Sequence, residues 1–238
     1  MATLPLTLED ISLAADGAML LDRVSLEIAA GSRTVILGAN GAGKSLLLRI
    51  CHGLIGPTRG RVLWGGADRL GAMRRRQAMV FQKPVMLRRS VGGNVAYGLK
   101  LVGLAKSERA ARVGHVLERV GLARLAGRDA RVLSGGEQQK LALARAWARE
   151  PEVLFLDEPT ANLDPGATAA IETIVGEIHA SGAKIVMTTH DLGQARRLAD
   201  EIVFLHRGRL AEQTPAHEFF AAPRSAEAAA FLRGELAW

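Results

Sequence analysis

Apolar residues recur along the chain in two spacings, and together they predict an alternation of strands and helices. Short apolar or alternating runs predict strands at 4–13, 20–28, 34–38, 61–64, 78–81, 152–159 and 184–190, and on both sides of Arg207-Gly208. Apolar positions at helical spacing predict helices at 43–53, 91–102, 107–120, 135–149, 165–181, 192–199 and over the tail, 215–238. Strands that alternate with helices favour an α/β fold with a mostly parallel sheet covered on both faces.

The pattern changes between about Lys83 and Val132, where strands vanish and only helical periodicity remains. We interpret this stretch as a helical subdomain inserted in the α/β core of one domain that spans residues 1–238. Near the amino terminus, two short strands are predicted around a turn at Asp16-Gly17.

Composition narrows the class of protein without identifying it. With 238 residues, 48% of them hydrophobic, the chain can bury a sizeable core. Cys51 is the one cysteine, so an intrachain disulfide is excluded. We expect no signal peptide and no transmembrane helix, because no basic leader and no uncharged run of eighteen apolar residues is present. The formal charge of +7 fits an anionic substrate, an acidic membrane surface or a nucleic acid.

The stretch GANGAGKS, residues 38–45, fits a phosphate-binding loop between a strand and a helix. Its glycines let backbone N–H groups point at one anion, and the helix that follows adds its dipole. Lys44 supplies a point charge for the phosphates and Ser45 a hydroxyl for Mg²⁺. The alternative is a glycine-rich turn that happens to end in Lys-Ser. The expected ATP-binding residues are Gly38, Ala39, Asn40, Gly41, Ala42, Gly43, Lys44, Ser45 and Leu46.

The stretch VLFLDE places Asp157 and Glu158 at the carboxyl end of a buried strand, the edge where α/β sheets bind ligands. Because side chains alternate along a strand, we expect the two carboxylates to point to opposite sides. Asp157 then suits the Mg²⁺ and Glu158 an attacking water, as general base. The alternative is that Glu158 only caps the following turn.

The stretch RVLSGGEQQKLALARA, residues 131–146, predicts a helix with an unusual start. Ser134 occupies the N-cap position and Glu137 completes a capping box, but Gly135 and Gly136 between them are poor helix formers. Glycines there leave the backbone open to an anion at the positive end of the helix dipole. The alternative is that they serve a tight crossing with another helix.

Taken in order, these motifs resemble those of the nucleotide-binding subunits of ABC transporters, and the resemblance covers nearly the whole chain. In that family they are called Walker A, Q-loop, signature, Walker B, D-loop and switch histidine. The matching stretches here are GANGAGKS, VFQKP with Gln82, LSGGE (133–137), VLFLDEP, ANLD (161–164) with Asp164, and TTHD with His190. The implied fold is a P-loop ATPase core with an antiparallel β subdomain and an inserted α-helical subdomain.

The resemblance implies a head-to-tail homodimer with ATP and Mg²⁺ as ligands. Binding of ATP in trans, to the γ-phosphate on the second copy, falls to the start of the signature helix. The implied trans residues are Ser134, Gly135, Gly136 and Glu137. Asp164 would lie at the dimer interface. The implied metal ligands are Ser45, Gln82 and Asp157, and the implied catalytic residues are Glu158, His190, Gln82 and Lys44.

Three positions depart from the family pattern. Where the family has an aromatic residue that stacks on adenine, this chain has Ala15, which puts stacking in doubt. Leu46 replaces a threonine that contacts phosphate, so one hydrogen bond is expected to be missing. Glu137 replaces the final glutamine of the signature, and its carboxylate weakens γ-phosphate binding unless it turns back to cap its own helix.

The stretch VFQKPVMLRRSVGGNVAYGLKL resembles importers of oxyanions, especially the tungstate and phosphate group. This implies integral membrane permease subunits, an extracytoplasmic solute-binding protein, and a peripheral position on the cytoplasmic face of the inner membrane. No nucleic acid is expected as a partner. Three other readings stay open: a soluble ABC ATPase acting on nucleic acid or ribosomes, the ATPase of an exporter, and a regulatory module that does not hydrolyse ATP.

Overall fold

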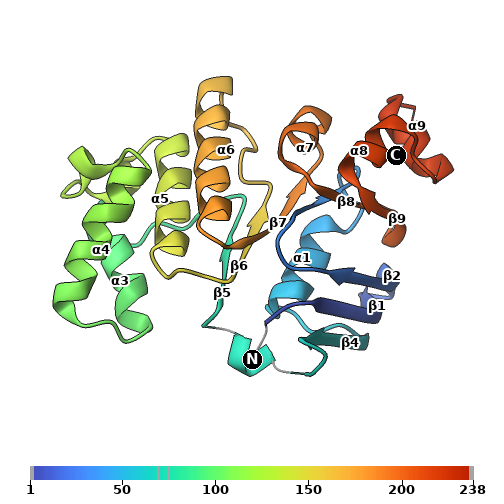
Figure 1. The fold of residues 1–238 in the computed structure, drawn as a ribbon, viewed down its shortest axis with the longest axis horizontal. Helices are drawn as coiled ribbons and strands as arrows, with labels where there is room; N and C mark the ends of the chain where they lie inside the picture. The colour runs from blue at the N-terminus through green and yellow to red at the C-terminus, as the bar shows by residue number, and fades with distance from the viewer. Residues whose placement is uncertain (1–2, 69, 74, 236–238) are drawn as a thin grey trace. The chain divides into compact units, whose positions relative to one another are not determined.

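The computed structural model describes residues 3–68, 70–73 and 75–235 (Figure 1). The chain divides into two compact units. The first unit is Met1–Arg74 with Lys184–Trp238, and the second unit is Arg75–Ala183. Each is described by itself below, and the prediction of one domain with a helical insertion at about 83–132 stays a prediction.

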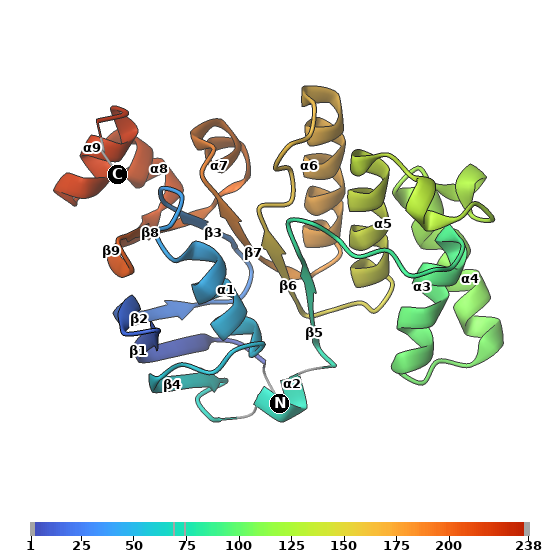
Figure 2. The same cartoon turned by 180° about the vertical axis from the view of Figure 1, so that it is seen from behind.

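The first unit contains a three-stranded antiparallel sheet in the order β2-β1-β4 (Figure 2). Its strands are β1 (Leu6–Ala15), β2 (Ala18–Ile28) and β4 (Arg59–Trp64). Asp16 and Gly17 join β1 to β2 with φ angles of 49° and 78°. Positive φ at both positions is the signature of a tight hairpin turn that matches strand twist. The predicted hairpin is therefore confirmed.

The first unit also holds four adjacent strands in the order β7-β3-β8-β9. They are β3 (Arg33–Leu37), β7 (Lys184–Thr189), β8 (Glu201–His206) and β9 (Arg209–Pro215). β3 runs parallel to β7 and β8, whereas β8 and β9 form the predicted antiparallel hairpin. Leu37 pairs with Thr189, so the segments that follow β3 and β7 emerge at the same edge.

Five helices complete the first unit, as far as the structure describes it. They are α1 (Lys44–His52), α2 (Leu70–Met73), α7 (Leu192–Leu198), α8 (Ala216–Ala221) and α9 (Ala226–Leu232). The predicted helical tail is confirmed as two helices, α8 and α9, and residues 236–238 lie outside the described residues. Phe204 of β8 contacts Phe219 and Phe231, with ring centroids 5.6 and 5.1 Å apart, which anchors both tail helices to the strand.

The second unit joins a short parallel strand pair to a group of helices. The strands are β5 (Gln77–Val80) and β6 (Val153–Asp157). The helices are α3 (Val91–Leu101), α4 (Lys106–Arg119), α5 (Gly135–Trp147) and α6 (Pro165–Ala180), with 3-10 turns at Ala123–Leu125 and Ala130–Val132. α5 packs against α3 and α4 on one side and α6 on the other (Figures 1 and 2). The predicted helices at 91–102 and 107–120 are confirmed.

None of the helices within the described ranges combines the length and the apolar character that crossing a membrane requires.

A buried polar network lies at the amino ends of β3, β7 and β8 in the first unit. Lys184 is 2% exposed, and its Nζ donates to Ser32 Oγ and Thr34 Oγ1, each at 2.8 Å. Thr34 Oγ1 donates in turn to Glu201 Oε2 at 2.8 Å. Burial lowers the pKa of Lys184 to about 8, although Glu201 and Asp200 oppose the shift.

This network predicts a specific dependence of stability on pH. Between about pH 8 and the ordinary lysine pKa of about 10.4, the folded chain releases the Lys184 proton while the unfolded chain retains it. The contribution of Lys184 to the free energy of unfolding therefore rises with pH in that window, by at most about 1.4 kcal/mol per unit. The measurement is urea unfolding of the wild type and Lys184→Met from pH 7 to 10.

The difference between the two proteins isolates Lys184 because both keep Cys51, whose burial raises the pKa of its thiol to about 12 and lowers stability at alkaline pH. We expect the wild type to gain relative to Lys184→Met above about pH 8. Parallel stability curves across this range would show that Lys184 keeps an ordinary pKa.

Candidate functional site

The phosphate loop follows β3 directly and contains two positions where only glycine fits. A Cβ on Gly38 would overlap the carbonyl oxygen of Leu205. Gly43, the N-cap of α1, has φ 98°, and a Cβ there would lie 2.7 Å from Leu21 Cδ2. Both contacts lie within the first unit, and they press the loop against β2 and β8. The curled backbone that the sequence predicts for this loop therefore depends on its glycines.

The positive end of α1 is left open to an anion. Its N-cap makes no side-chain hydrogen bond, and its first turn has no acidic residue. Lys44 is 4% exposed, and its Nζ donates to the carbonyl oxygens of Gly38 and Ala39 at 2.9 and 3.0 Å. A helix start without a cap, beside a buried ammonium group, suits phosphate oxygens. This geometry fits the predicted roles of the loop, which stay predictions.

His190 lies at the same edge of the first unit as the phosphate loop. It comes directly after β7, while Gly38 comes directly after β3, and the last residues of these two strands pair in parallel register. The ring is exposed. The neighbouring Asp191 is occupied as the N-cap of α7, where its Oδ1 accepts from Gln194 N at 2.9 Å. His190 is therefore the titratable side chain at this position that faces outward.

Of the two predicted carboxylates, Asp157 lies on the strand itself and Glu158 does not. β6 ends at Asp157, which is 2% exposed. Glu158 lies beyond the strand with φ 43°, in the left-handed region, so strand alternation does not decide where it points. Its Oε2 lies 3.5 Å from Gln82 Nε2. The structure thus brings the predicted general base and the predicted Gln82 together within the second unit.

The start of α5 forms the predicted capping box. Ser134 is the N-cap, and Glu137 Oε2 accepts from its backbone N at 2.8 Å and from its Oγ at 2.9 Å. These two hydrogen bonds from Ser134 hold the pKa of Glu137 below its usual range, with smaller contributions from Arg128 and Lys140. The Glu137 carboxylate thus turns back onto its own helix, the arrangement under which it does not oppose an anion.

The two glycines of α5 have different surroundings. A Cβ on Gly136 would lie 3.1 Å from Ala167 Cβ on α6, which is tighter than ordinary contact. A Cβ on Gly135 would lie 3.9 Å from Leu163 Cδ2, an ordinary contact, and Gly135 is exposed. A close helix crossing therefore accounts for Gly136 but not for Gly135, which leaves the helix tip open at the first position.

Asp164 has a local role that the sequence motif alone did not indicate. It is the N-cap of α6, and its Oδ1 accepts from Ala167 N at 2.9 Å, with Pro165 in the first turn. Its predicted position at a dimer interface stays a prediction. Ala15, the position that departs from an aromatic, is the exposed last residue of β1.

Two residues that hold the segment after Gln82 were not predicted from sequence. Asn94 on α3 is 1% exposed, and its side chain binds the backbone of Leu87 and Ser90. Arg145 on α5 donates from Nη1 to the carbonyl oxygen of Val85 at 2.7 Å. The available signal was an arginine inside the apolar run LALARAW and an asparagine inside the helix VGGNVAYGLKL.

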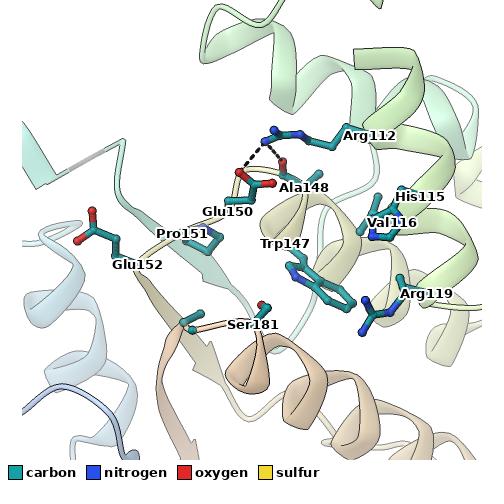
Figure 3. Close-up of a pocket in the computed structure, with 12 residues that line it drawn as sticks. Arg112, His115, Val116, Arg119, Trp147, Ala148, Glu150, Pro151, Glu152 and Ser181 are labelled. Carbon is teal, nitrogen blue, oxygen red and sulfur yellow. Dashed lines mark hydrogen bonds and ion pairs between the residues drawn. The ribbon is translucent and has the colours of Figure 1, made fainter. Parts of the chain in front are cut away.

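A cavity of about 440 Å³ lies at the carboxyl ends of α5 and α6, at the far end of α5 from its capping box (Figure 3). Arg112 pairs there with Glu150 at 3.1 Å. Arg119 pairs with Glu177 at 2.9 Å and stacks on Trp147, 4.7 Å from the ring centroid. Both guanidinium groups at this cavity already have acceptors. We therefore assign Arg112 and Arg119 the structural role of joining α4 to the residues at the ends of α5 and α6.

The predicted residues are distributed over both units. The phosphate loop, with Ser45, and His190 belong to the first unit, whereas Gln82, Asp157, Glu158, Asp164 and the start of α5 belong to the second. The predicted Mg²⁺ ligands, Ser45, Gln82 and Asp157, draw on both units and stay a prediction. A hydroxyl, an amide and one carboxylate are few ligands for Mg²⁺, which commonly takes its others from substrate phosphates and water.

Comparisons with known proteins place these motifs among described relatives. A family model described as "ABC transporter" matches residues 21–161, a range that ends before Asp164 and His190. The chain is 43% identical over 208 residues to the tungstate uptake system ATP-binding protein TupC of Peptoclostridium acidaminophilum, covering 87% of this chain and 97% of that protein. It is 40% identical over 240 residues to the phosphate import ATP-binding protein PstB 2 of Natronomonas pharaonis, covering 94% and 84%.

Other relatives carry names for the import of methionine or of Fe(3+) ions. Among solved structures, one described as the ATP binding subunit of an ABC transporter superposes with a TM-score of 0.84. It is 28% identical in sequence, and the match covers 98% of this chain and 99% of that one. The similarity therefore extends over both units and beyond the motifs themselves.

Proposed function

The chain belongs to the ABC transporter family, and from that premise we propose that it drives the uptake of an oxyanion such as tungstate or phosphate. As an import ATP-binding subunit it hydrolyses ATP. The proposal includes membrane permease components as partners, a dimer of two copies and a position peripheral to the inner membrane. The proposal concerns the solute, the site residues and the way in which two copies share each nucleotide.

The observation that carries the proposed ATP site is the open start of α1. A helix that begins without a side-chain cap or an acidic residue, next to the buried Lys44, leaves its N–H groups and dipole for an anion. Gly38 and Gly43 press this loop onto neighbouring strands, so it is shaped before ligand arrives. A triphosphate, with its β- and γ-phosphates at Lys44, is the ligand that suits this loop.

Hydrolysis is proposed to proceed by in-line attack of water on the γ-phosphate. Glu158 accepts the proton of that water. Gln82, whose Nε2 lies 3.5 Å from Glu158 Oε2, orients the Glu158 carboxylate and the water. His190 holds the γ-phosphate by a hydrogen bond, and Lys44 offsets the charge that develops on it. When bound by Ser45, Gln82 and Asp157, Mg²⁺ would supply further neutralisation of phosphate charge.

Two copies are proposed to complete each site head to tail. The tip of α5 presents Ser134 and the exposed Gly135 to the γ-phosphate held by the other copy. The dipole of this 13-residue helix favours the anion. Glu137 stays folded back on Ser134 by the capping box, which keeps its carboxylate out of the way. Asp164 would stand at the same interface.

The oxyanion assignment is supported by the relatives named for tungstate and phosphate, while those named for methionine and Fe(3+) mark the alternatives. An extracytoplasmic solute-binding protein and a permease pair are the expected partners. Adenine is expected to be held without aromatic stacking, because Ala15 presents only a methyl group.

The test is uptake by cells that express this chain together with candidate permease and solute-binding proteins. We expect accumulation of labelled tungstate or phosphate that disappears when Glu158→Gln replaces the wild type. Uptake of methionine or iron instead would contradict the oxyanion assignment. Export of the solute would contradict the proposed direction of transport.

The alternative of a soluble ATPase acting on nucleic acid rests on the formal charge of +7. Filter binding of the same protein to RNA and DNA across a range of salt separates the two proposals. Phosphate contacts give a steep salt slope, so nanomolar binding with such a slope would favour the alternative. Weak binding at physiological salt is the result that the importer proposal expects.

A further inference from the structure

The segment that carries Gln82 has no helix or strand of its own, yet it is held at both ends. It spans residues 81–90, between β5 and α3. At the upstream end, Gln82 Nε2 lies 3.5 Å from Glu158 Oε2. At the downstream end, the buried Asn94 accepts from Leu87 N at 3.0 Å and donates to the carbonyl oxygen of Ser90 at 3.0 Å. The downstream part therefore belongs to the body of α3.

Between these two ends a hydrogen bond joins the segment to a different helix. Arg145 Nη1 on α5 donates to the carbonyl oxygen of Val85 at 2.7 Å. The Val85 residue is 73% exposed, so the backbone, rather than the side chain, is what holds this point of the segment. The two residues are 60 positions apart in sequence, which excludes a role in local turn formation.

The charged side chain of Arg145 loses part of its hydration at this position, which costs free energy. Burial lowers the pKa of its guanidinium group, and within the described ranges no carboxylate pairs with it. Arg145 is partly buried, and charges that lose hydration in proteins are usually paired, whereas an apolar side chain of similar length is often at least as stabilising. A guanidinium whose one described hydrogen bond goes to the carbonyl of an irregular segment is therefore better explained by what it positions.

The same helix begins at the capping box. Arg145 and Ser134 stand eleven residues apart on α5, about 17 Å along one continuous helix. A rigid helix thus connects the Val85 carbonyl, three residues from Gln82, to the tip that is proposed to approach the γ-phosphate of a second copy. The Arg145 hydrogen bond to the Val85 carbonyl is thus a point at which the helix that carries this tip holds the Gln82 segment.

We propose that Arg145 is a positioning residue that couples the Gln82 segment to the tip of α5, so that Gln82 stays beside Glu158 when nucleotide is engaged in trans. This inference rests on the proposed function, because it assigns Gln82 and the α5 tip to one nucleotide site. Arg145 does not touch the nucleotide in this account and acts through Gln82.

The experiment compares Arg145→Met and Arg145→Lys with the wild type in the full chain. Loss of a hydrogen bond from a charged donor corresponds to about a tenfold effect or more. We expect Arg145→Met to lower the kcat for ATP about tenfold with KM changed less than about twofold, because ground-state binding at the phosphate loop is untouched. Arg145→Lys retains a donor and is expected to recover most of that loss.

Hydrogen exchange supplies a readout that a merely structural role would not move. In the wild type, ATP and Mg²⁺ are expected to protect both 83–87 and 134–137. In Arg145→Met, protection at 134–137 is expected to remain while protection at 83–87 is lost. The segment from 88 to 94, which Asn94 holds, should be unchanged in both proteins.

Arg109→Met is the matched control, because Arg109 Nη1 also donates to a backbone carbonyl, that of Leu104 at 2.9 Å. Its partner is local and lies away from Gln82, so kcat and the exchange at 83–87 should match the wild type. An Arg145→Met protein with wild-type kcat and exchange would overturn the coupling. A wild-type chain without ATP turnover would instead overturn the proposed function, and the coupling with it.

Discussion

Replacing Glu158 with glutamine is expected to lower steady ATP turnover by about 10²- to 10⁴-fold, the range that loss of a general base produces. The amide keeps the size of the carboxylate and its contact with Gln82, at 3.5 Å in the wild type, but cannot accept the proton of the attacking water. ATP binding at the phosphate loop should persist, because Lys44 and α1 are unaffected. The measurement is phosphate release under saturating ATP, with nucleotide binding followed separately.

The matched control is Glu152→Gln. Glu152 immediately precedes the opposite end of the same strand, is exposed, and pairs with Arg76 at 3.1 Å. This substitution removes one carboxylate of the same kind from the other end of β6 and should leave turnover unchanged. If Glu158→Gln retained full turnover, Glu158 would not be the base, and another group would have to accept the proton.

Gly135→Ala is expected to weaken ATP-driven dimerisation while leaving the protomer folded. The added Cβ meets only Leu163 Cδ2 at 3.9 Å, so the fold has room for it. Replacing a helical glycine by alanine should raise the free energy of unfolding slightly, by up to about 1 kcal/mol. The same methyl group would stand over the backbone that the γ-phosphate of the second copy is proposed to approach. We expect the dimer to dissociate at least about tenfold more readily, since the close backbone approach is lost.

The measurement is sedimentation of Gly135→Ala in the Glu158→Gln background with ATP and Mg²⁺. Gly114→Ala in the same background is the control, because Gly114 lies on α4 with nothing within 4 Å of the added Cβ. Binding of nucleotide to the monomer should be the same in Glu158→Gln alone and in the two double variants, with Gly135→Ala or with Gly114→Ala. An unchanged dimer in Gly135→Ala would show that the α5 tip does not approach the nucleotide closely.

The two variants separate the halves of the proposed site. Glu158→Gln changes chemistry after the nucleotide is bound, whereas Gly135→Ala changes assembly before chemistry takes place. If Glu158→Gln keeps turnover but Gly135→Ala weakens the dimer, the two copies share the nucleotide and another group is the base. If Glu158→Gln loses turnover but Gly135→Ala keeps the dimer, ATP is hydrolysed without close approach of the α5 tip. Arg145→Met then reports on whether assembly and Gln82 are linked.

The sequence by itself determined the features whose causes lie within a few residues. The alternation of strand and helix, the turn at Asp16-Gly17, and the capping box of Ser134 with Glu137 could all be predicted, because each depends on local spacing and local hydrogen bonds. The phosphate loop was recognisable for the same reason. The order of the motifs was enough to indicate the family, since it requires no knowledge of how distant segments pack.

Only the tertiary structure decided the features that join distant segments. Glu158 leaves the strand with φ 43°, which alternation could not anticipate. A Cβ on Gly136 would lie 3.1 Å from Ala167 Cβ, whereas a Cβ on Gly135 would have room. Lys184 reaches Thr34 across 150 residues, and Arg145 reaches Val85 across 60. Their partners are chosen by the packing of whole elements against one another, and neither residue type nor spacing along the chain records that choice.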